Sequence, residues 1–263
     1  MKYFYTFILT TLIATGCSSV GIPIDYNKSN YGYHPLDPLS VNIVTTSGKP
    51  PTNQELLESL PDETMRIAIG ELDSKGSITY GPATVGLAGS SYIVILDYIK
   101  FNTNALPVIV TSDDFGQKSA SLTEDRNQAN VIVPTYIGIG LRMTANIKVN
   151  KGQINLGSLF ALGAAAESKQ ISGSMVIQTL GISGESISSI MPMPSEISST
   201  TIQNAILALG TMKAKMYEDD THITPRVIGV YNNLGVGSET INGFISTMLQ
   251  KEQDLKVSQA SNN

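Results

Sequence analysis

Residues that could perform catalysis or bind a metal are few in this 263-residue chain. It contains two histidines, and one of them, His222, follows Asp219 and Asp220 closely in the run Asp-Asp-Thr-His. Mixed carboxylate and imidazole ligands suit zinc or manganese, so this cluster is the best metal candidate. Acidic side chains of a loop are usually solvated, however, and we therefore expect no bound metal and no cofactor.

The remaining carboxylates also have structural explanations. Asp113 and Asp114 precede Phe115-Gly116 and are typical of a turn. Asp97 lies within an apolar run at residues 91–101, where a carboxylate needs a partner or water, and we expect it at an exposed sheet edge. The sequence has no Gly-x-Ser-x-Gly, His-Glu-x-x-His, phosphate-binding or EF-hand pattern. We therefore expect no catalytic residues.

The N-terminus has the features of an export signal. Lys2 precedes an apolar stretch at residues 4–13, which is too short for a permanent membrane helix of about 20 residues. Small residues follow in the order Ala14-Thr15-Gly16-Cys17, and Cys17 is the only cysteine, so it has no partner for an intramolecular disulfide. This segment resembles the lipobox of bacterial lipoproteins, although leucine is commoner at the first position. The alternative is an ordinary signal peptide cut near Gly16.

The resemblance implies cleavage before Cys17, a diacylglycerol thioether on its sulfur and a third acyl chain on its amine. Two or more acyl chains hold a protein stably on a membrane, whereas one does not. Ser18 and Ser19 follow the cysteine, where an aspartate favours retention in the inner membrane in enterobacterial sorting. We therefore expect a lipid anchor in the outer membrane, on either face.

Composition narrows the classes of partner. The formal net charge is −5 and basic residues do not cluster, which argues against nucleic-acid binding. Tryptophan is absent, so a sugar-binding platform of stacked tryptophans is excluded, although tyrosines could replace it. The abundant glycine, serine and threonine are typical of a β-rich envelope protein.

Periodicity predicts the organisation of the chain. We expect a signal peptide at 1–16, an anchor and extended tether at 17–51, one α+β domain at 52–250, and a polar, disordered tail at 251–263. The tether could instead be a partner-binding strap, with Tyr26, Tyr31, Tyr33 and His34 as its contacts.

Within the domain, we expect a mostly antiparallel sheet with short helices and one long amphipathic helix at about 200–217. Thr52 and Glu55 have capping-box spacing for a short helix. Apolar residues fall on odd positions over 131–149, which predicts a long strand with one buried and one wet face. Gly138 and Gly140 share the other face, where the strand bends or another backbone approaches closely.

These features favour a non-enzymatic accessory or assembly lipoprotein of a surface or secretion structure, with envelope proteins or further copies of itself as partners. Two alternatives remain open. The chain could be a subunit of an outer-membrane ring or pore that inserts a β-hairpin from residues 131–182, where the polar positions would face the lumen. It could also be a lipid-anchored hydrolase or carbohydrate-binding protein whose site residues follow no known pattern.

The anchor can be tested directly. Because Cys17 carries the only thiol, Cys17→Ser should abolish lipidation completely. Metabolic labelling with a clickable fatty acid should mark the wild-type protein and leave the variant unlabelled. Equal labelling of both proteins would rule out the lipobox interpretation.

Overall fold

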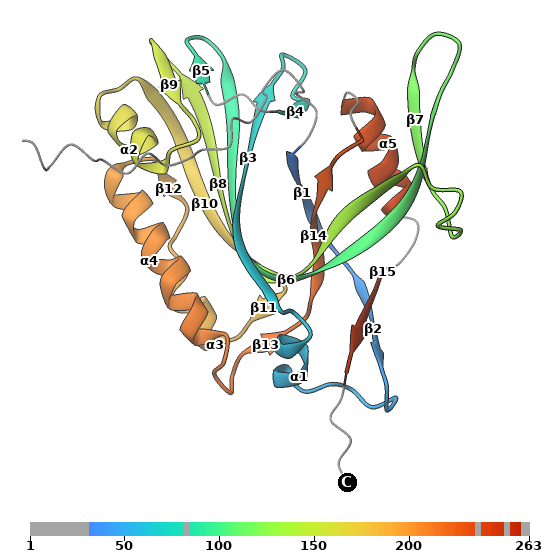
Figure 1. Ribbon diagram of the computed structural model, residues 1–263. Helices are drawn as coiled ribbons and strands as arrows, with labels where there is room; N and C mark the ends of the chain where they lie inside the picture. The colour runs from blue at the N-terminus through green and yellow to red at the C-terminus, as the bar shows by residue number, and fades with distance from the viewer. Residues whose placement is uncertain (1–31, 82–84, 235–237, 250–252, 259–263) are drawn as a thin grey trace, which may run out of the picture.

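One large, mostly antiparallel sheet dominates the structure, a computed structural model that describes residues 32–81, 85–234, 238–249 and 253–258 (Figure 1). One 17-residue helix and several short helices accompany the sheet, which confirms the expected α+β fold. Within these described ranges, no helix is long and apolar enough to cross a membrane.

The main sheet has the strand order β1-β14-β8-β6-β3-β4, and three further strands pair along its sides. β10 pairs with β8 and β12, and β7 pairs with β6. The path strands are β1 (Gly32–Leu39), β14 (Arg226–Asn232), β8 (Val131–Val149), β6 (Ser91–Ser112), β3 (Asp62–Leu72) and β4 (Ile78–Gly81). The side strands are β10 (Ile171–Leu180), β12 (Ser195–Glu196) and β7 (Lys118–Leu122).

Smaller elements surround the main sheet. Three two-stranded pairs are β5 (Val85–Leu87) with β9 (Gln153–Asn155), β11 (Ile182–Ser183) with β13 (His222–Ile223), and β2 (Val41–Thr45) with β15 (Gln253–Val257). The helices are α1 (Asn53–Glu58), α2 (Leu159–Glu167), α3 (Glu185–Ser188), α4 (Ser199–Lys215) and α5 (Ser238–Leu249).

β6 and β8 form the axis of the sheet. They pair without a break from Ser91 opposite Lys148 to Val108 opposite Val131. The strand expected at 131–149 is confirmed, and its odd positions from Ile137 to Val149 lie in the main core, on the face that α2 and α4 cover. A Cβ at Gly140 would collide with the carbonyl oxygen of Tyr98, which confirms the close backbone approach expected there.

The sheet curls until its first strand meets its last. In Figure 1, β6 and β8 bend sharply, so that β3 and β10 rise on one side and β14 and β7 on the other. His34 of β1 then lies 4.9 Å, ring centre to ring centre, from Tyr80 of β4. The enclosed inner face carries a second, aromatic-rich apolar cluster, which consists of Tyr33, Ala68, Ile95, Ile99, Phe101, Tyr136, Leu180 and Ile228.

A buried ion pair lies within this inner face. Arg142 of β8 donates Nε–H to Asp97 Oδ1 at 2.8 Å and Nη2–H to Asp97 Oδ2 at 2.6 Å, and the two side chains are 4% and 0% exposed. Arg142 also donates to the carbonyl oxygens of Leu36 in β1 and Ile228 in β14. The Tyr33 hydroxyl donates to Asp97, and burial raises the pKa of Tyr33 well above its ordinary value, so it keeps its proton.

This interior corrects two sequence expectations. Asp97 was expected at an exposed edge, yet β6 is an inner strand of the sheet and the carboxylate is fully buried. Arg142 was expected on a wet face, but the curled sheet brings β1 over that face and buries the guanidinium. Alternation of apolar and polar residues identified the two faces correctly without showing that both are covered.

Two segments expected to lack regular structure are strands. Residues 32–45, assigned to the tether at 17–51, form β1 and β2, and β1 completes the main sheet beside β14. Residues 253–257, assigned to the disordered tail at 251–263, form β15, which pairs in parallel with β2. The signal peptide and Cys17 lie outside the described residues. Pro35 and Pro38 disguise β1 because proline is tolerated only at irregular or edge positions of a sheet.

The helical expectations are close to the observed elements. The capping box of Thr52 and Glu55 is present at the start of α1. The helix expected at about 200–217 is α4, Ser199–Lys215, and the Ser198 side chain caps its N-terminus. The Ser198 backbone N–H donates in turn to Thr201 Oγ1 at 2.9 Å, which completes the box.

The buried pair should determine much of the stability. Asp97→Ala leaves Arg142 buried without its counter-ion, and we expect it to lower the free energy of unfolding by roughly 3–5 kcal/mol. Lys213→Ala, which removes an exposed ion pair with Glu63, is the matched control and should change stability little. Urea titration measures both, and equal effects would contradict the role given to the buried pair.

Candidate functional site

The main sheet is interrupted along one edge of β6. On one side, β8 covers residues 91–108 of this strand. On the other side, β3 pairs with residues 91–101 and β7 with residues 108–112. Among the described residues, no strand covers 102–107 on that second side, so a gap separates the end of β3 from the end of β7.

Neighbouring hydrogen bonds show which backbone groups point into the gap. Val149 N–H of β8 donates to Ser90 O, directly before β6, at 3.0 Å. The even-numbered residues of β6 therefore direct their N–H and C=O groups towards β8. Thr123 N–H donates to Pro107 O at 3.1 Å, so odd-numbered residues direct theirs towards β7 and the gap. The unbroken pairing with β8 carries this alternation through the gap.

Two residues are therefore left with unpaired backbone groups. Phe101 is the last residue that faces β3, and Pro107 has no N–H and gives its carbonyl to Thr123. Between them, Thr103 and Ala105 each direct one N–H and one C=O into the gap. No hydrogen bond to these four groups is found within the part of the chain that the structure describes.

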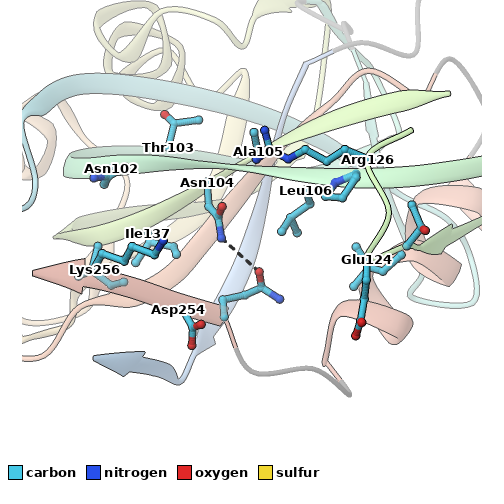
Figure 2. A pocket seen from close by; sticks show the side chains of 15 residues that line it. Asn102, Thr103, Asn104, Ala105, Leu106, Glu124, Arg126, Ile137, Asp254 and Lys256 are labelled. Carbon is cyan, nitrogen blue, oxygen red and sulfur yellow. Dashed lines mark hydrogen bonds between the residues drawn. The ribbon is translucent and has the colours of Figure 1, made fainter. Parts of the chain in front are cut away.

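A groove of about 540 Å³ lies beside the gap, between β6, the chain after β7, and β15. Figure 2 shows Asn104 pointing towards β15, where its Nδ2 donates to Gln253 Oε1 at 3.5 Å, whereas Thr103 points the other way. Buried Leu106 and Ile137 supply apolar surface to the groove. Its charged lining residues are Glu124, Arg126, Asp254 and Lys256, two of each sign.

The geometry of the site suits binding of an extended chain. Thr103 and Ala105 are two residues apart, so their gap-facing groups lie about 6.6 Å apart along the strand. The backbone groups of a second strand that would pair with them have the same spacing. The lining contains no histidine, serine or cysteine. The site therefore offers hydrogen bonds and a groove for a side chain but no activated nucleophile.

The residues singled out for chemistry lie elsewhere and do not converge. Asp220 accepts a hydrogen bond from Ser186 N–H at 2.7 Å, which lowers the pKa of Asp220, and His222 is exposed in β13 opposite Ser183. Asp219 lines a different cavity, beside α1. No group of three or more potential metal ligands occurs among the residues that were placed.

The Asp113 turn is confirmed. Asp113 Oδ1 accepts backbone N–H bonds from Phe115 at 2.9 Å and Gln117 at 2.8 Å in the β6–β7 turn. Asp114 is exposed in the same turn. Both carboxylates belong to a hairpin tip and not to a paired-carboxylate site.

His34 lies in the sheet rather than in a tether. Burial lowers its pKa to about 4, so the ring is neutral near pH 7. With Tyr80, Arg142 and Gln178 it lines a second cavity of about 610 Å³ between β1 and β4. The Arg142 guanidinium already pairs with Asp97, so Arg142 offers no uncompensated charge to a ligand in this cavity.

Sequence reasoning missed Thr103 and Ala105. The apolar run in the sequence ends at residue 101, although the strand continues to Ser112 and has 22 residues. The only sequence signal is that the buried even positions before the gap, such as Leu96 and Tyr98, resume at Leu106 and Val108. The type of a residue does not show whether its backbone N–H and C=O groups are paired.

Comparison with protein-family models, with curated proteins and with solved structures finds no match for this chain.

Proposed function

We propose that this protein is a non-enzymatic envelope lipoprotein, held on the outer membrane by lipid on Cys17, that binds an extended segment of a partner protein. The partner segment lies in the gap of the main sheet, between β3 and β7. The protein then acts as an accessory or assembly component of a surface or secretion structure. The unpaired backbone groups of Thr103 and Ala105 are the observation that carries this proposal.

Strand addition is the binding mode that these groups favour. Four unpaired backbone groups between two existing ladders offer an incoming strand main-chain bonds, with pockets for alternate side chains. Because β3 and β7 both run antiparallel to β6, the added segment would run antiparallel too. Its residue opposite Asn104 would direct its side chain into the groove, since opposite residues share a face.

The energetics suit an anchored protein. Each added hydrogen bond contributes about 0.5–1.5 kcal/mol, so four bonds and one seated side chain give modest affinity. Attachment of the protein to the same membrane as its partner would raise the effective concentration and strengthen the complex without new contacts.

Two observations support binding over the alternatives. The apolar odd positions of β8 at Ile137, Ile139 and Leu141 are at most 1% exposed, so they pack in the protein core and offer no surface to lipid. The groove is lined by no histidine, serine or cysteine, and its only side-chain hydroxyls are those of Thr103 and Thr123. These findings weigh against the pore and hydrolase hypotheses respectively.

Photo-crosslinking in cells tests the proposal. A photoreactive residue at Arg126, in the groove, should give a discrete adduct with another envelope protein, whereas one at exposed Leu207 on α4 should not. Thr103→Pro removes one gap-facing N–H where no bond within the described chain is lost, and it should reduce the Arg126 adduct by about tenfold.

Thr103→Val keeps the N–H and is the matched control for that variant. It should preserve the adduct, and thermal melting should show that both variants remain folded. Absence of any adduct from position 126 would contradict partner binding in the groove. An adduct that persists unchanged in folded Thr103→Pro would contradict strand addition.

A further inference from the structure

One end of the sheet carries exposed apolar side chains. Val85 and Leu87 of β5 are 46% and 50% exposed, and Phe160 in the first turn of α2 is 70% exposed. Gly86, between the two β5 residues, packs against Val149 and Leu156, so its neighbours point outwards. Val85 pairs with Asn155, which precedes Phe160 by five residues. Figure 1 shows β5, β9 and α2 together at this end.

Four exposed lysines lie at the same end of the sheet. Lys148 of β8 lies opposite Ser91 of β6, which lies opposite Leu72 at the end of β3. Lys151 follows in the next turn. Lys151 N–H donates to Gln170 O at 3.3 Å, which places Lys169 beside it, and Lys75 lies in the β3–β4 turn. None of these four lysines forms an ion pair within the described chain. The acidic residues near this end are Glu71, Asp73, Glu167 and Glu196, the last of which lies on β12 opposite Ser174.

The tether reaches the folded part near this end. His34, two residues after the first residue of β1, contacts Tyr80 of β4, and Figure 1 shows β1 starting beside β4. Residues between Cys17 and Gly32 can span at most about 50 Å. A lipid on Cys17 would therefore keep this end within reach of the bilayer at high effective concentration.

We propose that this end, formed by Val85, Leu87 and Phe160 with Lys75, Lys148, Lys151 and Lys169, docks on the anionic lipid surface of the membrane that holds the anchor. Apolar side chains enter the interface while the lysines contact lipid phosphates. The contact orients the protein, because Thr103 and Ala105 lie 12 and 14 residues along β6 from Ser91, the residue of β6 at this end, and the gap then faces the aqueous side. This inference rests on the lipid anchor of the proposed function.

The absence of tryptophan makes the orientation measurable with a single reporter. Phe160→Trp and, as control, Leu207→Trp are each introduced into the lipidated full-length protein and reconstituted in vesicles of phosphatidylethanolamine and phosphatidylglycerol. Leu207 is 67% exposed on α4, so the two positions are matched in exposure. With lipids brominated on their acyl chains, Phe160→Trp should lose roughly half of its emission or more, and Leu207→Trp should lose little.

A second variant tests the contact itself. Val85→Ser with Leu87→Ser in the Phe160→Trp background should reduce the quenching, whereas Met193→Ser, at an 82% exposed position elsewhere, should not. Equal quenching at positions 160 and 207 in vesicle-bound protein would overturn the orientation while leaving the anchor intact. Protein that does not remain with the vesicles would instead contradict the lipid anchor and, with it, this inference.

Discussion

The bond between Asp97 and Arg142 constrains the whole sheet. The two residues lie directly opposite each other on β6 and β8, and two further N–H groups of the guanidinium donate to carbonyl oxygens of β1 and β14. Tyr33 of β1 adds a third contact to the carboxylate. A buried charge pair of this kind costs desolvation and is stabilising only where all its groups are satisfied. Its geometry therefore favours the one arrangement in which β1 folds back over the inner face.

A second feature of the sheet is that β6 is left incomplete on one side. β6 and β8 bend sharply in Figure 1, and β3 pairs with residues 91–101 of β6 while β7 pairs with residues 108–112, so neither strand covers residues 102–107. Gly138 and Gly140 lie opposite Phe101 and Ile99, just before the gap, and permit the close approach of the β6 and β8 backbones at that point. The groove beside the unpaired groups of Thr103 and Ala105 is bounded by β15.

The sequence predicted those elements whose signal is local. The alternation over 131–149 and the capping box at Thr52 depend on neighbouring residues, and both are confirmed. Burial of Asp97 and Arg142 could not be predicted, because it depends on β1, which lies far away in sequence and is interrupted by prolines. The site is harder still to predict, since it consists of backbone groups whose partners are missing, and its residues Thr103 and Ala105 are chemically ordinary. The metal candidates drew attention because they have distinctive side chains, yet the fold places them in loops and turns.

Amide hydrogen exchange of the purified mature protein tests the open gap most directly. The backbone N–H groups of Asn102 and Asn104 point towards β8, and those of Thr103 and Ala105 point into the gap. The account predicts that the second pair exchanges at least about a hundredfold faster than the first, because only the first is held by a ladder. Comparable protection of all four amides would show that the chain itself fills the gap, and would contradict the account.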